Sequence, residues 1–207
     1  MKVRLDERLL ACGELVRLDK IICDVGTDHA LLPCWLLQRG AKSVIASDIN
    51  DGPLLSARET MEQYGCEGIT LVKSDGLRNI PFAEDVIIAG MGGELIGRIL
   101  SECTFLSEDF RCILQPMTKA EELRRSMYRN GFEIISERTA NAHGKCYTVI
   151  YGRYTGKTAE IDDETAFFGK NTDRAYIEKQ LAVLYKMGNR NPSCRTLADK
   201  VKQRLNY

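Results

Sequence analysis

The sequence predicts an α/β protein with a Rossmann-like, doubly wound sheet of mostly parallel strands. Short apolar runs alternate with segments of helical periodicity from residue 20 to residue 129. The spacing between successive runs suits strand–helix–strand units, whose crossover helices cover the two faces of a parallel sheet. A chain of 207 residues is long enough for one such domain and a small extension.

Five apolar runs are expected to form the parallel strands, because they are short and carry few charges, as strands buried on both faces do. They are residues 20–25, 43–48, 69–72, 85–89 and 110–114. Two further β-rich runs, residues 132–138 and 146–154, lie on either side of the turn sequence Asn141-Ala142-His143-Gly144. We expect them to add a hairpin with antiparallel pairing at one edge of the sheet.

The expected helices have apolar residues three or four positions apart. The first is indicated by Leu5, Leu9, Leu10, Leu15 and Val16. Four more are expected at residues 29–38, 53–64, 94–100 and 120–129. Pro53 suits the first turn of its helix, and Asn130-Gly131 ends the last of them.

A helical hairpin is expected after the polar segment at residues 155–164. Its two stripes of apolar residues are Ile177, Leu181, Leu184, Leu197, Val201 and Leu205. Residues 188–193 between them have the composition of a turn, and Ser193 is a candidate N-cap. We therefore expect a Rossmann-like domain at residues 1–155 and a small, basic helical domain at residues 156–207.

The charge of the chain is balanced overall but uneven along its length. Residues 170–207 carry nine Lys and Arg against three Asp and Glu, a net charge of +6 in a chain whose total is zero. Basic segments of this kind favour anionic partners such as nucleic acids. Lys119, Arg124, Arg125 and Arg129 are further candidates for phosphate contacts, although solvated helix faces have the same composition.

Composition also narrows the location and the chemistry. No apolar run approaches the ~20 residues of a membrane span, and the first residues lack the apolar core of a signal peptide, so we expect a cytoplasmic protein without membrane contact. The eight cysteines contain no C-x-x-C pair, so we expect buried, reduced thiols and no metal site. A monomer or a weak dimer is expected, since helical tails can self-associate.

The loop after the first strand carries the most informative motif, Asp24-Val25-Gly26-Thr27-Asp28-His29. Glycine there lets the backbone approach a ligand at the start of the next helix. The loop is not G-x-G-x-x-G, because Asp28 and Ala30 replace two of those glycines. A carboxylate would repel a pyrophosphate but attract the ammonium and sulfonium groups of S-adenosylmethionine.

Further candidates follow the next strands. Asp48, with Ile49 after it, ends the second strand, where an acid accepts the ribose hydroxyls of an adenosine; this fits NAD and S-adenosylmethionine alike. Asp75-Gly76 follows the third strand and has the polarity to bind an adenine amino group, although a solvated turn looks the same. Gly90-Met91-Gly92 follows the fourth strand, and Gln115-Pro116 the fifth, where Gln115 either contacts a base edge or caps a turn.

These motifs, in this order, resemble the bacterial tRNA (adenine-22, N1)-methyltransferases of the TrmK type. The matching segments are Asp24–Ala30, Leu32-Pro33, Asp51–Pro53, Gly76-Leu77, Ile88–Gly93, Leu114–Pro116 and Gly144–Tyr147. The resemblance runs from Leu5 to about Tyr154 and is looser over the tail. It implies a Rossmann-like N-terminal domain, a coiled-coil-like C-terminal domain, S-adenosylmethionine as cofactor and tRNA as partner.

The resemblance also implies methyl transfer to N1 of an adenine. N1 has an in-plane lone pair and needs no base to become nucleophilic, so orientation is expected to matter more than acid–base catalysis. Asp28 and His29 are expected to shape the methyl-donor pocket, with Gln115 and Pro116 near the target base. The residues expected to bind the cofactor are Asp24, Gly26, Thr27, Asp28, Asp48, Ile49, Asp75, Gly76, Gly90, Met91 and Gly92.

Three other functions remain open from the sequence. A Rossmann-fold methyltransferase for another RNA, a protein or a small molecule would share the cofactor motifs. An NAD-dependent oxidoreductase is disfavoured by Asp28 and Ala30 in the glycine loop. A non-catalytic RNA-binding protein would keep the fold, but the cofactor motifs of this chain look intact.

Overall fold

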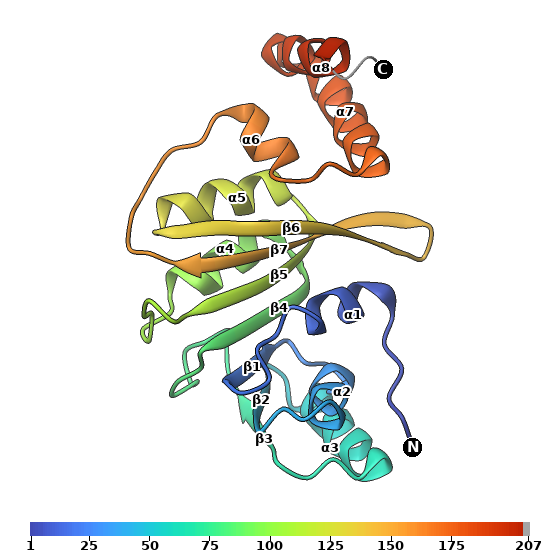
Figure 1. The fold of residues 1–207 in the computed structure, drawn as a ribbon, viewed down its shortest axis with the longest axis vertical. Helices are drawn as coiled ribbons and strands as arrows, with labels where there is room; N and C mark the ends of the chain where they lie inside the picture. Colours follow the sequence, from blue (N-terminus) through green and yellow to red (C-terminus); the bar gives the residue numbers. More distant parts are fainter. Residues whose placement is uncertain (205–207) are drawn as a thin grey trace.

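In the computed structural model, which describes residues 1–204, a seven-stranded sheet runs through the molecule with helices on both faces (Figure 1). The strands are β1 (Ile21–Val25), β2 (Ser43–Asp48), β3 (Ile69–Lys73), β4 (Asp85–Gly92), β5 (Arg111–Thr118), β6 (Phe132–Ala142) and β7 (Lys145–Tyr154). They lie in the order β3-β2-β1-β4-β5-β7-β6. Strand β7 pairs antiparallel with β5 and β6, and the other pairs are parallel, so the predicted sheet is confirmed.

The turn between β6 and β7 closes at two residues, His143 and Gly144, with φ of 51° and 70°. Positive φ at both positions is the mark of a type I′ turn, which matches the twist of the strands that it joins. Ala142 pairs with Lys145 directly across the turn. The hairpin projects past the sheet on the side of the first helix (Figure 1).

The helices confirm the predicted alternation. They are α1 (Glu7–Gly13), α2 (Leu31–Gln38), α3 (Asp51–Tyr64), α4 (Gly93–Ser101), α5 (Ala120–Arg129), α6 (Asp163–Phe168), α7 (Arg174–Gly188) and α8 (Pro192–Arg204). Helix α5 has its predicted bounds, while α2, α3 and α4 begin one or two residues away from the expected position. Helix α1 begins at Glu7 because the Asp6 carboxylate accepts from the amides of Arg8 and Leu9. Helix α2 begins two residues later than expected, because Ala30 has a left-handed backbone with φ of 52°.

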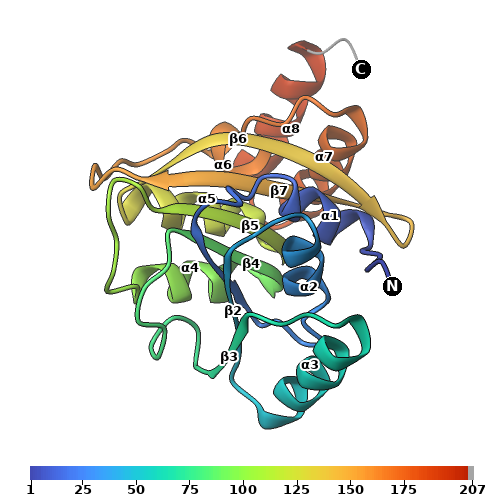
Figure 2. The same ribbon diagram turned by 60° about the horizontal axis from the view of Figure 1, so that its bottom comes forward.

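Helices lie on both faces of the sheet (Figure 2), and on each face an apolar cluster holds them to it. Successive residues of a strand point to opposite faces, so Val86 and Ile88 of β4 join one cluster and Ile87 joins the other. The first cluster includes buried residues of α4 and α5, and the second includes buried residues of α2 and α3. These strands therefore read as nearly continuous apolar runs.

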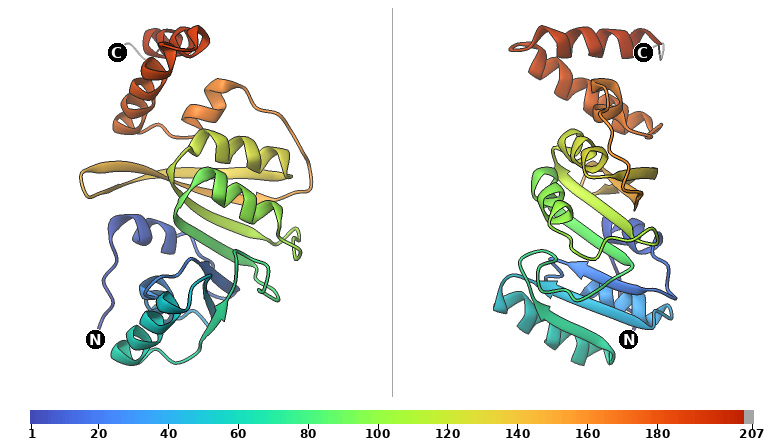
Figure 3. Two further views of the ribbon diagram at one scale, coloured as in Figure 1. Left: turned by 180° about the vertical axis from the view of Figure 1, so that it is seen from behind. Right: turned by 90° about the vertical axis from the view of Figure 1, so that its left-hand side faces the viewer.

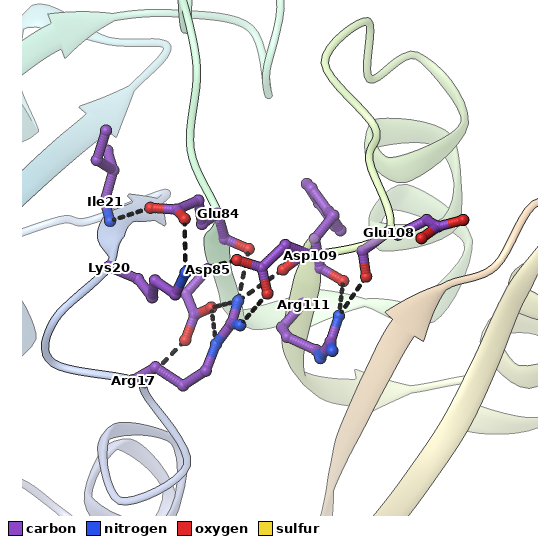
Figure 4. Close-up of polar contacts among 9 residues, drawn as sticks. Arg17, Lys20, Ile21, Glu84, Asp85, Glu108, Asp109 and Arg111 are labelled. Atoms are coloured by element: carbon purple, nitrogen blue, oxygen red, sulfur yellow. Dashed lines mark hydrogen bonds and ion pairs between the residues drawn. The ribbon is translucent and has the colours of Figure 1, made fainter.

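A network of charged residues lies at the amino ends of the central strands (Figure 4). Arg17, from the segment before β1, donates to both carboxylate oxygens of the fully buried Asp85 and to Asp109. Glu84 accepts from the Ile21 amide at 3.0 Å and from Lys20 at 2.9 Å. The network fixes the amino ends of β1, β4 and β5. The loops at the carboxyl ends of these strands are not part of it.

The three C-terminal helices, α6 to α8, form a helical appendage beyond the β6–β7 edge of the sheet (Figure 3). A third apolar cluster joins them, with Phe168, Leu184 and Val201 among its buried members. The expected helical hairpin corresponds to α7 and α8. The sequence did not predict α6, which begins within the segment expected to be a linker and ends after it. Leu205, the last residue of the predicted stripe, lies outside the described residues.

The predicted N-cap at Ser193 is wrong. Helix α8 begins at Pro192, and the Asn191 side chain accepts from the Ser193 amide at 3.2 Å. Asn191 therefore caps the helix, with Pro192 in the first helical position, where proline loses no intrahelical hydrogen bond. The sequence allowed both readings, because asparagine and serine are equally good caps.

Arg124 joins the helical appendage to the sheet, so its predicted role as a phosphate contact is wrong. Its side chain is fully buried and pairs with Glu137 of β6 through hydrogen bonds of 2.9 and 2.6 Å. It also donates to the Ala166 carbonyl of α6 and to the Tyr176 hydroxyl of α7. These contacts satisfy the guanidinium where four elements meet, and they raise its pKa above the usual value although burial opposes this.

Seven of the eight cysteines are buried and Cys146 is half-buried, all as free thiols, which agrees with the role expected for them. Burial raises the pKa of Cys12, Cys23 and Cys112. Among residues 1–204, no helix combines the length and apolar character that crossing a membrane requires.

Replacing Arg124 with alanine is expected to lower the free energy of unfolding by about 3–5 kcal/mol, because the Glu137 carboxylate would remain buried without its partner. Urea denaturation measures this change. The control is Arg129→Ala, which breaks an exposed pair with Glu160 and should leave the midpoint nearly unchanged. Equal midpoints for the two variants would contradict the role given to Arg124.

Candidate active site

A cavity of ≈ 250 Å³ opens where the carboxyl ends of β1 and β4 meet. The strand order reverses between these two strands, and ligands of doubly wound sheets bind at this switch point. The lining residues come from α1, from β1 and the loop after it, from the start of α2 and from the end of β4; they are Arg8, Leu9, Asp24, Gly26, Thr27, Asp28, His29, Leu31, Leu32, Ala89 and Gly90. The cavity thus brings together six residues that the sequence singled out.

The loop after β1 has an unusual backbone. Gly26, Asp28 and Ala30 have φ of 73°, 53° and 52°, which is uncommon for the two residues other than glycine. The amides of Gly26 and Thr27 both donate to the Ser47 carbonyl of β2, at 2.8 and 2.9 Å. The loop therefore turns sharply across the strand ends, and it leaves the side chains of Asp28 and His29 exposed at the cavity.

Asp24 is the buried acid of the cavity. Its side chain is 5% exposed and accepts a 2.7 Å hydrogen bond from the Thr27 hydroxyl. Burial raises the pKa of Asp24 to about 6, with a further contribution from the negative charge of Asp48, while Thr27 opposes the shift. A carboxylate held in this way is stabilised by a cationic ligand, which restores the favourable interactions that burial removes.

The ends of β2 and β3 hold the other predicted acids. Asp48 is half-buried and accepts from the Asn50 amide at 3.0 Å, and Ile49 beside it is 54% exposed. Asp75 pairs with Arg98 at 3.0 Å and with Arg78 at 3.2 Å, and the Arg98 hydrogen bond lowers its pKa. Asp48 therefore keeps free acceptor capacity, whereas two guanidinium groups already engage Asp75.

The glycine-rich end of β4 is held open by Gln115 of β5. The Gln115 side chain is fully buried, and its carbonyl oxygen accepts from the Gly90 amide at 3.1 Å and from Arg8 at 3.2 Å. A Cβ added to Gly90, whose φ is 80°, would meet no atom within 4 Å, so open space lies in front of this backbone. Met91 packs behind the loop after β1, where its terminal methyl group approaches Gly26.

Arg8 is a cavity residue that the sequence did not reveal. It lies on α1, pairs with Asp6 at 2.7 Å, reaches Gln115 107 residues along the chain, and has its guanidinium 5.7 Å from the centre of the Tyr147 ring. Nothing in the helical periodicity around Arg8 distinguishes it from a solvated arginine. Its neighbour Tyr147 belongs to the Gly144–Tyr147 motif, and this motif is the one feature of the sequence that points to this part of the site.

Other predicted residues lie outside this cavity. Pro116 is buried and lines a neighbouring hollow of ≈ 310 Å³ between β5 and α7. The proposed basic rim is largely neutralised, because Lys119 pairs with Glu94, Arg125 with Asp163 and Arg129 with Glu160. An acidic cavity with an open backbone wall suits a positively charged ligand. Lys and Arg side chains that could contact phosphate must therefore come from segments other than Lys119 and α5.

Comparisons with known proteins agree with this geometry. A family model described as a methyltransferase domain matches residues 5–150. The tRNA (adenine(22)-N(1))-methyltransferase of Bacillus subtilis (strain 168) is 36% identical over 166 residues, which cover 78% of this chain and 70% of the relative. The similarity thus includes the cavity and all seven strands except the end of β7.

Two solved structures are similar over nearly the whole chain. A putative tRNA (m1A22) methyltransferase of Streptococcus pneumoniae, in complex with S-adenosyl-L-methionine, has a TM-score of 0.80 and 30% identity, and covers 96% of this chain and 97% of its own. The m1A22 tRNA methyltransferase of B. subtilis has a TM-score of 0.80 and 25% identity, with coverage of 99% and 97%. The likeness therefore extends through the helical appendage.

Gly26→Ala is expected to destabilise the loop after β1 by about 1–2 kcal/mol, because φ of 73° disfavours any side chain. The new Cβ would also lie 2.3 Å from the Met91 methyl group, which must move. The matched control is Gly52→Ala in the first turn of α3, where a Cβ meets nothing within 4 Å. Thermal unfolding compares the two; equal loss would contradict the account of the loop.

Proposed function

Because the chain belongs to the family of tRNA (adenine(22)-N(1))-methyltransferases, we infer that it transfers a methyl group from S-adenosylmethionine to N1 of adenine 22 in tRNA. The observation that carries this function is the acidic cavity at the β1–β4 switch point, which lies inside the matched segment. An NAD-dependent reaction fits the same cavity poorly, because Asp24 and Asp28 would face a pyrophosphate.

We propose that the cofactor is held by the residues at the ends of β1 to β4. The carboxylate of Asp48 is the acceptor for the ribose hydroxyls, Asp24 with Gly26 and Thr27 faces the ammonium end, and Ile49 packs on the adenine. Asp75 and Gly76 border the adenine edge, where the pairs of Asp75 with Arg78 and Arg98 hold its carboxylate in one orientation. The bound cofactor supplies an electrophilic methyl group on a sulfonium.

The residues proposed to act on the target base do so by position. Gly90, followed by Met91 and Gly92, is proposed to give a backbone wall that contacts both the cofactor and the planar base, and Asp28 and His29 line the same cavity as Gly90. Gln115 has its amide oxygen engaged by Gly90 and Arg8, so it acts by holding these groups and not by binding the base. Pro116 shapes the neighbouring backbone. Attack by N1 needs alignment and exclusion of water, and no proton leaves N1.

We propose that residues 156–207 form a separate helical domain that binds the tRNA backbone. Among the basic residues of this segment that are exposed and form no ion pair within residues 1–204 are Lys186, Arg190, Arg195 and Lys202. Because Lys119, Arg125 and Arg129 form ion pairs, these four residues are better candidates for phosphate contacts. We also propose that the protein acts in the cytoplasm, without a metal, as a monomer or a weak dimer.

Incubating the protein with an unmodified tRNA transcript and methyl-labelled S-adenosylmethionine tests the function. Mass spectrometry of the digested nucleosides is expected to find labelled 1-methyladenosine. A transcript with guanosine at position 22 should remain unlabelled. Label in the second transcript, or in another nucleoside, would mean a different target.

Asp48→Ala is expected to weaken S-adenosylmethionine binding by roughly ten- to a hundredfold, because a charged acceptor of two hydroxyl groups is lost. Isothermal titration calorimetry measures the affinity. Asp51→Ala is the matched control, since Asp51 lies nearby at the start of α3 and its carboxylate faces the exposed Lys73. Unchanged affinity in Asp48→Ala would remove Asp48 from the ribose site.

Cofactor affinity is expected to fall about tenfold between pH 7 and pH 5. Since the pKa of Asp24 is raised to about 6, its carboxylate is mostly ionised at the higher pH and mostly protonated at the lower. A positively charged ligand prefers the ionised form, so binding weakens as the pH drops through this pKa. Calorimetry on Asp24→Asn should give weaker binding with a flat profile; an unaltered pH dependence in that variant would assign the titration to another group.

A further inference from the structure

A second hollow, of ≈ 560 Å³, lies between the end of β5, the tip of the β6–β7 hairpin and α7. We call it the joint groove, because it separates the sheet from the helical appendage; Met117, Lys145, Tyr147 and Lys179 are among its lining residues. The hollow of ≈ 310 Å³ beside Pro116 shares Met117 and Lys179 with it. The joint groove is thus continuous along the face of α7.

Lys179 is held in the joint groove without an acidic partner. Its ammonium donates to the Cys146 carbonyl at 2.6 Å and lies 5.3 Å from the centre of the Tyr147 ring. Lys179 is exposed overall, but partial desolvation of its ammonium, together with the charge of Lys145, lowers its pKa. Across residues 1–204, no Asp or Glu side chain forms an ion pair with Lys179 or Lys145, whereas Lys119 on the same side pairs with Glu94.

Tyr147 lines the joint groove and contacts Arg8, which lines the candidate active site. The Arg8 guanidinium and the Lys179 ammonium lie 5.7 and 5.3 Å from its ring centre. Arg8 lines the first cavity and also contacts the Met117 sulfur, at 3.3 Å, which lines the groove. A chain whose base enters the first cavity therefore has its backbone close to the groove.

We propose that Lys145 and Lys179 bind the phosphodiester backbone next to the target adenosine, so that the joint groove positions the exposed nucleotide. This inference rests on the proposed function. Two cations without carboxylate partners, in a groove that Arg8 links to the cavity through Met117 and Tyr147, complement the negative charge of an RNA strand whose base is turned out of its stack. Because Lys179 belongs to α7, docking of the RNA on the appendage is coupled to alignment in the cavity.

The test compares Lys179→Gln with Lys179→Arg and with the control Lys42→Gln. Lys42 is exposed and precedes β2, at the sheet edge opposite the cavity. Lys179→Gln is expected to weaken binding of the tRNA transcript about fivefold and to reduce the slope of log affinity against log salt by about one. Its methyl-transfer rate at saturating tRNA should also fall about tenfold, since the nucleotide is misaligned.

Lys179→Arg should retain most of the binding, and Lys42→Gln should match the unmodified protein. Cofactor affinity and thermal stability of all three variants should be unchanged, which separates a lost contact from a lost fold. A loss in Lys179→Gln that disappears at saturating tRNA would overturn the positioning role. No loss at all, in a preparation that methylates adenine 22, would overturn the groove and leave the proposed function intact.

A double-mutant cycle between Lys179 and the tRNA backbone identifies the phosphate that Lys179 binds. A tRNA assembled by ligation carries a neutral methylphosphonate on one or the other side of adenosine 22. For one of these positions the unmodified protein should lose as much affinity as Lys179→Gln loses with ordinary tRNA, and the variant should lose nothing more. Losses that multiply at both positions would place Lys179 on another part of the RNA.

Discussion

The candidate active site depends on the buried amide of Gln115. Its oxygen accepts from the Gly90 amide and from Arg8, and its nitrogen donates to the Pro116 carbonyl at 3.1 Å, so no hydrogen-bonding capacity of a fully buried group is wasted. The consequence is geometric. Gln115 of β5 fixes the Gly90 end of β4, and through Arg8 it holds α1 at the cavity. The cavity at the ends of β1 and β4 is therefore also lined by α1, the loop after β1 and the start of α2.

The cavity and the surfaces proposed to bind RNA carry charges of opposite sign. The cavity presents Asp24 and Asp28, which suits a cofactor with ammonium and sulfonium groups, while the joint groove and the appendage present cations without acidic partners. Methyl transfer moves positive charge from the sulfonium to the adenine ring, and the nearby carboxylates favour keeping that charge inside the cavity. The buried pair of Arg124 and Glu137, with the contacts of Arg124 to α6 and α7, joins the appendage to the sheet.

Local sequence signals predicted the sheet, the edge hairpin and α5 at its observed bounds, because periodicity and turn residues act within a few positions. They also placed Asp24, Gly26 and Gly90 at one edge, since parallel strands end together. Local sequence signals could not predict contacts between segments that are distant in the chain. Arg8 and Arg124 look like solvated arginines in the sequence, yet one enters the cavity and the other is buried, and both outcomes depend on partners more than ten residues away.

The central claim is that the cavity at the β1–β4 switch point is the cofactor site, and a crystal structure with S-adenosylhomocysteine tests it most directly. The account predicts the ligand in this cavity, with its ribose hydroxyls on the Asp48 carboxylate and its amino group facing Asp24 and the Gly26–Thr27 backbone. A ligand bound elsewhere, or one in the cavity that leaves Asp48 untouched, would contradict the account.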